Sequence, residues 1–180
     1  MPLTTTHALV PLAGALAFPR RPLPWRLVLV AMVAAAAPDL DAFVYPIWHL
    51  PASSIYTHRG VAHSLFVALV AGLFAARFHK QLGVRPLVAG AVVGAAMASH
   101  GLLDMMTDYG LPVAYLWPLS THRYFAPWRP IHSGELEWGH WATQAPPRLY
   151  SELWHLIIPM FAVALAIRIG RRMLGKLASG

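Results

Sequence analysis

The sequence predicts an all-α membrane protein, a polytopic bundle of about five transmembrane helices in one domain covering residues 1–180. The first observation is composition: 57% of the residues are hydrophobic and 12% are charged, whereas soluble domains carry about 25% charged residues. The second is that apolar residues gather into five segments close to the length that crosses about 30 Å of hydrocarbon as a helix. The mean hydropathy of +0.51 agrees with both.

The five expected spans fit this requirement unequally. They are residues 2 to 18, 25 to 38, 61 to 78, 86 to 103 and 153 to 169. Three threonines and a histidine interrupt the start of the first segment, and the second segment is short, so the last three segments are the better spans. Residues 104 to 152 are expected to form one long outer connection rich in Trp and Pro.

The basic residues predict the orientation of these spans. Arg20 and Arg21 follow the first apolar segment instead of preceding it, which argues against a cleaved signal peptide and places the N-terminus outside. Five crossings then leave the C-terminus in the cytoplasm. Ten of the fourteen basic residues fall on the cytoplasmic side, namely Arg20, Arg21, Arg26, Arg77, Lys80, Arg85, Arg168, Arg171, Arg172 and Lys176.

The acidic residues agree with this topology, because all seven lie in the outer segments. The net charge of +7 therefore indicates orientation, and no nucleic-acid partner is expected. We expect an integral protein of the bacterial or archaeal cytoplasmic (inner) membrane whose partners are membrane lipid and a lipid-like substrate. The sequence leaves the oligomeric state open.

Histidines and aspartates gather where four expected helices reach the outer face. The candidate metal ligands are His7, Asp39, Asp41, His58, His63, His100 and Asp104. Ionisable groups at or within a span are costly and are normally paired, ligated or in contact with water. The seven residues therefore predict a metal site at the outer face.

The local spacing of these residues suits ligation. His100 and Asp104 are four apart and share one face of a helix. Asp39 and Asp41 reach one centre if the backbone there is extended. A helix that begins near Gly60 lets His58 approach from the loop and His63 from the first turn. The alternative for His100 and Asp104 is an internal hydrogen-bonded pair, and a single histidine at a helix end commonly caps the helix.

The donor types restrict the metal. Seven candidates exceed the four ligands of one tetrahedral site, so either some of them orient the ligands or two ions bind. Mixed His and carboxylate ligation favours zinc, with manganese or iron as alternatives. The chain has no cysteine, which excludes disulfides, thiol nucleophiles and cysteine-based zinc sites.

Three residues are candidates for catalysis beside the metal. Arg59 is either a cation that reaches toward the membrane surface or a clamp for a phosphate or oxyanion. Ser64 is either a hydrogen-bonding group at a helix start or a nucleophile, and His7 is either a ligand or an acid. Further residues could complete the site, namely His122, His132, Glu135, Glu137 and His140.

Longer motifs around these residues resemble a known family. The ordered set is His7, APDLDAF (37–43), THRGVAHSL (57–65), ASHGLLDMMTDYG (98–110) and LPVAYLWPLSTHRYFAPW (111–128). It resembles the YdjM-like inner-membrane proteins over residues 7 to 137. That family is LexA-regulated, and metal-dependent hydrolase activity is attributed to it.

The resemblance implies polar motif positions at His7, Asp39, Asp41, His58, Arg59, His63, Ser64, His100, Asp104 and Thr107, with Gly110 and Pro118 as shape-setting positions. The chain departs from the family pattern at Ala42 and Phe43, where the family often has His or Pro. The loop before the HRG motif is also short here, and Glu135 and Glu137 match a later family glutamate only loosely.

The predicted function is a metal-dependent hydrolase with its active site at the outer membrane face. A phosphoester of a lipid or of a lipid-linked molecule is the expected substrate, ahead of a lipid amide. Two other classes stay open: a metal transporter or sensor, and a structural protein whose polar cluster only holds helices together.

Overall fold

The computed structural model describes residues 2–17, 22–43, 47, 49–51, 54–133 and 141–177. Within these residues the chain is helical, with two isolated β-bridges, Thr107 with Ile131 and Val113 with Tyr124, and no strand. The prediction of an all-α chain is confirmed. In chain order, the helices are α1 (Thr4–Ala17), α2 (Trp25–Ala36), the 3₁₀ helices η1 (Ala37–Phe43) and η2 (Val61–His63), α4 (Leu65–Arg77), α5 (His79–Leu82), α6 (Pro86–Met105), α7 (Trp141–Glu152), the π-helix η3 (Leu153–Ile157) and α8 (Ile158–Leu177).

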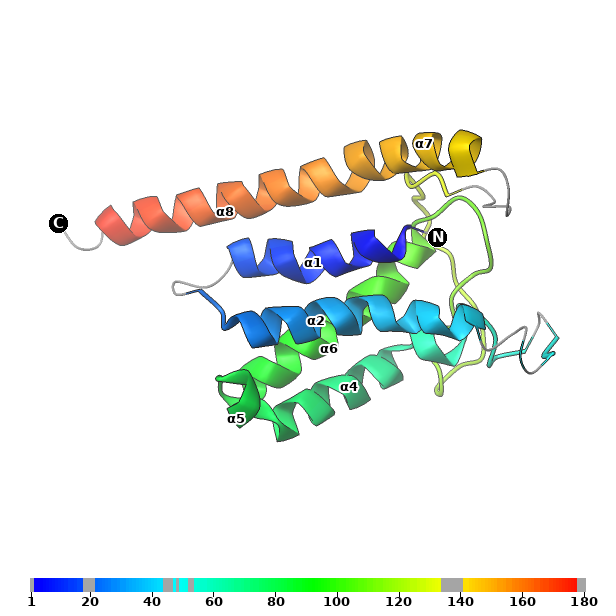
Figure 1. The fold of residues 1–180 in the computed structure, drawn as a ribbon, viewed down its shortest axis with the longest axis horizontal. Helices are drawn as coiled ribbons and strands as arrows, with labels where there is room; N and C mark the ends of the chain where they lie inside the picture. Colours follow the sequence, from blue (N-terminus) through cyan, green and yellow to red (C-terminus); the bar gives the residue numbers. More distant parts are fainter. Residues whose placement is uncertain are drawn as a thin grey trace.

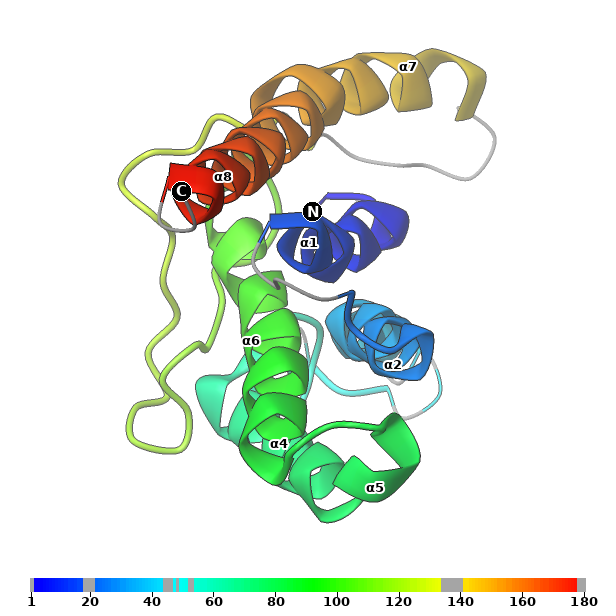
Figure 2. The same cartoon turned by 90° about the vertical axis from the view of Figure 1, so that its left-hand side faces the viewer.

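The helices form one bundle in which α6 crosses behind α1 and α2 (Figure 1). Helix α6 packs against α4 and α2, and α1 packs between α2 and α8, as the perpendicular view shows (Figure 2). The start of α1 and the ends of α2 and α6 meet at one end of the bundle. The end of α1, the start of α2 and the end of α8 meet at the opposite end.

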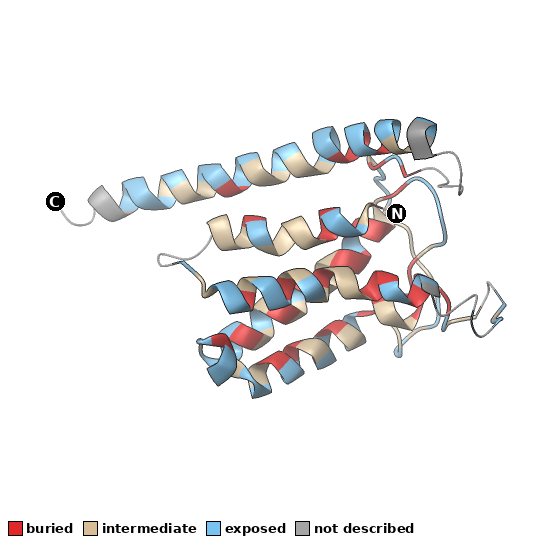
Figure 3. Cartoon of the chain, viewed as in Figure 1, coloured by how far each residue is buried: buried red, intermediate tan, exposed pale blue. Residues whose placement is uncertain are grey.

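Two of the described helices have the length and apolar composition of a membrane span. They are Pro86–Met105 and Ala145–Leu174, the second of which runs without interruption through α7, η3 and α8. Helix α4 is apolar but shorter. Large apolar side chains such as Leu69, Phe74 and Leu165 are exposed. Exposed positions occur along all the long helices of the bundle (Figure 3). Exposed apolar side chains suit contact with lipid chains.

The expected long connection over residues 104 to 152 is only partly a connection. Residues 104 and 105 complete α6, and α7 begins at Trp141 despite Pro146 and Pro147 inside it. Proline normally interrupts a helix because it removes a hydrogen bond and clashes with the preceding turn. Here Arg148, Ser151 and Glu152 lie on one helix face and are all buried, so their tertiary contacts hold α7 in place.

Glycine allows α4 and α6 to approach closely. A Cβ at Gly72 of α4 would lie 2.8 Å from the carbonyl oxygen of Gly90 of α6, and one at Gly94 would lie 3.3 Å from that of Ala68. Gly90 and Gly94 form the small-residue spacing that brings membrane helices together. The close contact between α4 and α6 therefore depends on glycine, because a side chain at these positions would meet the backbone of the facing helix.

Replacing Gly72 by alanine should destabilise the bundle, because the methyl group must push the two backbones apart. The expected loss is about 1–3 kcal/mol of unfolding free energy, as for other overpacked positions. The measurement is the apparent melting temperature in detergent. Gly14→Ala is the matched control, since a Cβ there meets nothing within 4 Å. An equal effect of both variants would contradict the close contact.

Candidate metal centre

Four distant segments bring histidine and aspartate side chains to one end of the bundle. His7 lies near the start of α1, Asp39 lies in η1, His63 lies in η2, and His100 and Asp104 lie in the last turns of α6. Each is at most 5% exposed. Asp39, His63, His100 and Asp104 offer ligand atoms that all lie within 4.8 Å of one another. We call these four residues the inner cluster.

Carboxylate oxygens lie among the ring nitrogens of the inner cluster. Nε2 of His100 is 3.3 Å from Oδ1 of Asp39 and 3.7 Å from Oδ2 of Asp104. Nε2 of His63 is 3.4 Å from the same Oδ2 and 4.0 Å from Oδ1 of Asp39. Thr4 donates a hydrogen bond of 2.6 Å to the other oxygen of Asp39, which fixes the rotation of that carboxylate.

Hydrogen-bond partners set the tautomer of His100. Its Nδ1 lies 2.7 Å from the carbonyl oxygen of Ala35. Because a carbonyl only accepts, Nδ1 carries a proton, and in a neutral ring the lone pair of Nε2 would then point to the cluster. Nδ1 of His63 lies 3.1 Å from Oδ2 of Asp41, which offers His63 the same arrangement. A carbonyl or carboxylate behind the ring is the usual support of a metal-binding histidine.

Asp41 joins a second group, which consists of Asp41, His58 and His63. Nδ1 of His58 is 2.7 Å from Oδ1 of Asp41, and the His58 side chain is 25% exposed. The pKa of Asp41 lies below its ordinary value: burial acts to raise it, but the hydrogen bonds from His58 and His63 outweigh burial. This group can hold a second ion, or Asp41 can orient the two imidazoles.

The backbone at Asp39 and Asp41 is not extended, so the condition under which both carboxylates would reach one centre is not met. Residues Ala37–Phe43 form the 3₁₀ helix η1, which directly continues α2. A 3₁₀ helix has three residues per turn, so side chains two apart point to different sides. Asp39 therefore faces His100, whereas Asp41 faces His58 and His63. This geometry divides the predicted ligands into two groups.

His7 lies beside the inner cluster. Its ring stacks on that of His100 with centroids 3.7 Å apart, and its Nε2 is 3.6 Å from Oδ1 of Asp104. The residue is fully buried. This position is compatible with either predicted role, as a further ligand or as an acid next to the carboxylate.

The charge of the site fits a divalent cation. Three buried carboxylates, Asp39, Asp41 and Asp104, lie together, and Arg59 forms an ion pair with Asp104. The buried Arg148, which also acts on Asp39 and Asp104, is paired with Glu152. Carboxylates therefore outnumber the buried guanidinium groups when the histidines are neutral. Buried atoms without a hydrogen-bond partner among the described residues include Nε2 of His63, Nε2 of His100 and Oδ1 of Asp104. Unsatisfied buried polar atoms cost about 1–3 kcal/mol each. A dication would offset the charge and engage these lone pairs together.

Arg59 connects the cluster to the outer connection. Its Nε is 3.2 Å from Oδ2 of Asp104, Nη1 donates to the carbonyl of Leu111 at 2.7 Å, and Nη2 donates to the hydroxyl of Thr107 at 3.0 Å. Gly110 has a φ of 100°, and a Cβ there would lie 3.1 Å from Nη1. The structure thus supports a bracing role for Arg59, while its role as an oxyanion clamp stays a prediction.

Ser64 begins helix α4. Its side-chain oxygen accepts a hydrogen bond from the backbone N–H of Val67 at 3.2 Å, as an N-cap residue does. No described histidine or carboxylate hydrogen-bonds its hydroxyl. The structure therefore supports the predicted capping role and gives no support to a nucleophilic one.

The other candidates lie apart from these groups. The His122 ring contacts Tyr124, and Nδ1 of His132 is 2.6 Å from Asp108 with the His132 side chain 63% exposed. Neither histidine belongs to a group of possible ligands. Glu135, Glu137 and His140 lie outside the described residues. At the shape-setting position Pro118, the peptide bond between Trp117 and Pro118 is cis.

Sequence reasoning missed three residues that position the site. A Cβ at Gly101 would lie 2.5 Å from the carbonyl oxygen of His63, so glycine beside His100 allows η2 to approach α6. Arg123 donates to the backbone carbonyls of Ser54 and His58 and thus holds the loop that carries His58. Glu152 accepts hydrogen bonds from the N–H of Leu3 and the hydroxyl of Thr6 at the start of α1.

Replacing Glu152 by alanine should lower the unfolding free energy by about 1–3 kcal/mol, because the start of α1 loses both acceptors in a buried place. His7 lies in the next position after Thr6, so its placement should loosen as well. The measurement is thermal unfolding. Glu152→Gln keeps one acceptor oxygen and should lose less. Equal stability of the wild type and Glu152→Ala would contradict the capping role.

The comparisons with known proteins agree with this arrangement. The family model described as YdjM inner membrane protein matches residues 1–175. The chain belongs to the YdjM family. The inner membrane protein YbcI of Escherichia coli (strain K12) is 35% identical over 136 residues, which cover 73% of this chain and 76% of YbcI. No solved structure matches the chain.

Membership of the YdjM family confirms the resemblance that the sequence motifs indicate. It also confirms the predicted location, because the family and the YbcI relative are inner membrane proteins and two described helices are long enough to span a membrane. The chain is an integral protein of the inner membrane, and its buried group of Asp and His side chains could hold a metal ion.

Proposed function

We propose that this YdjM-family protein is a metal-dependent hydrolase that acts on a phosphoester of a lipid or lipid-linked molecule at the outer face of the membrane. The observation that carries the proposal is the inner cluster, where two histidines with supported Nδ1 atoms and two carboxylates converge in a buried place with excess negative charge. Zinc is the first expectation for the ion, with manganese or iron as alternatives.

The proposal includes five membrane crossings with the N-terminus outside and the C-terminus in the cytoplasm. It is supported by five described helical segments at the expected places and by the separation of charge along the bundle. The described acidic residues lie at the end where α1 starts, and Arg168, Arg171 and Arg172 lie at the opposite end. That distribution matches the preference for basic residues on the cytoplasmic side.

The chain's own groups suggest how substrate would reach the site. The inner cluster is at most 5% exposed, whereas His58 beside it is 25% exposed in its side chain. We therefore place the substrate on the His58 side, where Asp41 orients the imidazole. When bound, a divalent ion in such a site activates water and polarises a phosphoryl oxygen. Asp39, His63, His100 and Asp104 would hold it, with His7 as a further ligand or an acid.

The burial of the cluster favours a second candidate, a metal that only holds the helices together. The hydrolase and the structural metal site predict the same metal content but different activity. A third candidate is a cluster that binds no metal, in which protonated histidines would offset the charge of the carboxylates. Transport is less favoured, because a cation would have to pass from an acidic end of the bundle to one with three arginines.

The test combines metal analysis with a substrate panel. Protein purified in detergent and loaded with zinc, manganese or iron would be assayed against a lipid phosphate monoester, a lipid diphosphate, a phospholipid and a lipid amide. We expect metal-dependent release of phosphate or of an alcohol that is lost in His100→Ala. One or two metal equivalents without any hydrolysis, beside an active control enzyme, would contradict the hydrolase and favour the structural metal.

A further inference from the structure

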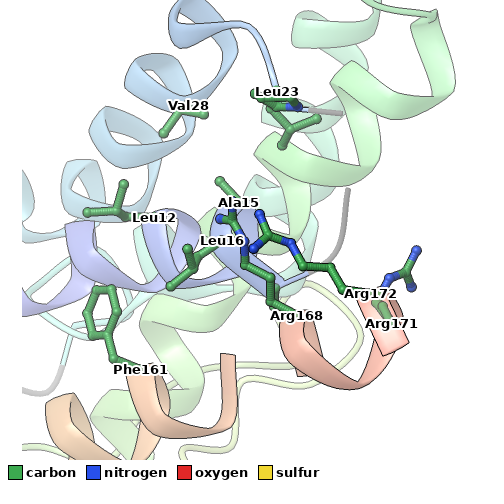
Figure 4. Close-up of a pocket in the computed structure, with 11 residues that line it drawn as sticks. Leu12, Ala15, Leu16, Leu23, Val28, Phe161, Arg168, Arg171 and Arg172 are labelled. Atoms are coloured by element: carbon green, nitrogen blue, oxygen red, sulfur yellow. The ribbon is translucent and has the colours of Figure 1, made fainter. Parts of the chain in front are cut away.

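A cavity lies at the end of the bundle opposite to the inner cluster. It has a volume of about 540 Å³ and opens between the end of α1, the start of α2 and the end of α8. Its walls are apolar where Leu12, Leu16 and Phe161 meet, and basic where α8 contributes Arg168, Arg171 and Arg172. Figure 4 shows Arg168 and Arg172 reaching toward α1 with their guanidinium groups near each other, while Arg171 points away from them.

No carboxylate among the described residues pairs with the arginines of this cavity. Among the described residues, no Asp or Glu forms an ion pair with Arg168, Arg171 or Arg172, and the described acids lie at the other end of the bundle. Two guanidinium groups directed at one place repel each other, and an anion between them removes that repulsion. The planar guanidinium fork matches the oxygens of a phosphate group in particular.

The apolar part of the cavity decides which phosphate compound fits. Free phosphate would engage the arginines but would leave the walls around Leu16 and Phe161 in contact with water. The apolar span Ala145–Leu174 includes these arginines near its end, so they lie where a lipid headgroup meets the hydrocarbon. Basic pockets between membrane helices bind anionic headgroups in this way.

We propose that this cavity binds an anionic phospholipid, with its phosphate held by Arg168 and Arg172 and the upper part of one acyl chain against Leu12, Leu16 and Phe161. The volume of about 540 Å³ is enough for a headgroup and part of a chain, within the usual range of ligand sites. The lipid would fill the space between α1 and α8, two helices that contact each other along the bundle. This site is independent of the metal chemistry proposed above.

The test is native mass spectrometry of the detergent-purified protein with added phosphatidylglycerol or phosphatidylcholine of the same chain length. We expect one phosphatidylglycerol to bind at least tenfold more tightly than phosphatidylcholine. The double variant Arg168→Gln, Arg172→Gln should lose this preference. Arg77→Gln, Lys80→Gln is the matched control, because it removes the same charge from exposed residues at the same end of the bundle and should keep the preference.

Two further arms complete the test. Arg168→Lys, Arg172→Lys keeps the charge without the guanidinium fork and should retain only part of the preference, and circular dichroism checks that each variant is folded. An equal loss in the Arg77, Lys80 control would show diffuse charge attraction and overturn the site. Full competition by glycerol 3-phosphate would show a soluble anion site, and equal binding of both lipids would show no headgroup recognition. Either result overturns the proposal.

Discussion

Asp104→Asn should abolish stoichiometric metal binding. Asp104 is fully buried, and its carboxylate oxygens lie 3.6 Å from Nε2 of His7 and 3.4 Å from Nε2 of His63. Asparagine keeps the shape but removes one of the charges that would hold a dication. Loss of a group that merely orients a ligand lowers metal affinity about 10- to 100-fold. Loss of a ligand should therefore lower it by more than about 100-fold.

The measurement is metal content by plasma mass spectrometry after purification and after reconstitution with zinc, manganese or iron. Asp108→Asn is the matched control, since it changes the same charge in the same region but removes contacts to His132 and Ser133 instead. The wild type and the control should retain one or two equivalents. If Asp104→Asn kept as much metal as the control, the inner cluster would not be the metal site. If the wild type took up no metal, protonated histidines would explain the cluster.

The sequence predicted the convergence of the site better than its internal geometry. Apolar runs followed by polar residues placed Asp39, His63, His100 and Asp104 at one end of the bundle, and the structure brings all four together. Spacing alone did not show that Asp39 and Asp41 face different sides, because APDLDAF has no pattern that separates a 3₁₀ helix from an extended segment. The continuation of α2 into η1 decides that geometry.

Long-range contacts explain which other structural roles could not be predicted from the sequence. Glu152 caps α1 from a distance of 149 residues, and no local pattern connects the two. The sequence places residues 141 to 152 in the outer connection, because the buried face of α7 becomes evident only beside α1 and His132. The sequence leaves Arg59 open between a cation at the membrane surface and an oxyanion clamp, and its hydrogen bonds to Thr107 and Leu111 are visible only when the outer connection folds over it. A sequence shows which side chains are costly to bury, and the fold shows which partners offset that cost.

Arg59→Ala should be the most destabilising single substitution among the residues that hold the outer connection in place. The side chain is 1% exposed, and its removal leaves Asp104 without its cation and Leu111 and Thr107 without their donor. Breaking a buried ion pair by removing one partner costs about 3–5 kcal/mol. For a chain of this size the expected fall in apparent melting temperature is roughly 6 to 20 °C.

The backbone conformation of Arg59 allows the lost side-chain contacts to be distinguished from backbone strain. Its φ of 62° lies in the left-handed region, which disfavours a side chain by about 1–2 kcal/mol. Alanine keeps a Cβ and therefore keeps that strain, whereas glycine relieves it. Arg59→Gly should consequently be less destabilised than Arg59→Ala. Arg59→Lys can reach Asp104 but cannot bond Thr107 and Leu111 at the same time, so it should recover only part of the loss.

The same variants distinguish bracing from catalysis. Arg129→Ala is the control, because Arg129 is an exposed cation within the outer connection and contacts the ring of Phe125. It should change the melting temperature by only a few degrees. A stable Arg59→Ala protein that keeps its metal but loses hydrolysis would show that the guanidinium acts on substrate and that bracing is not its main role. A large loss of stability in metal-free protein would show instead that Arg59 holds the outer connection against Asp104, because stability measured without metal does not depend on catalysis.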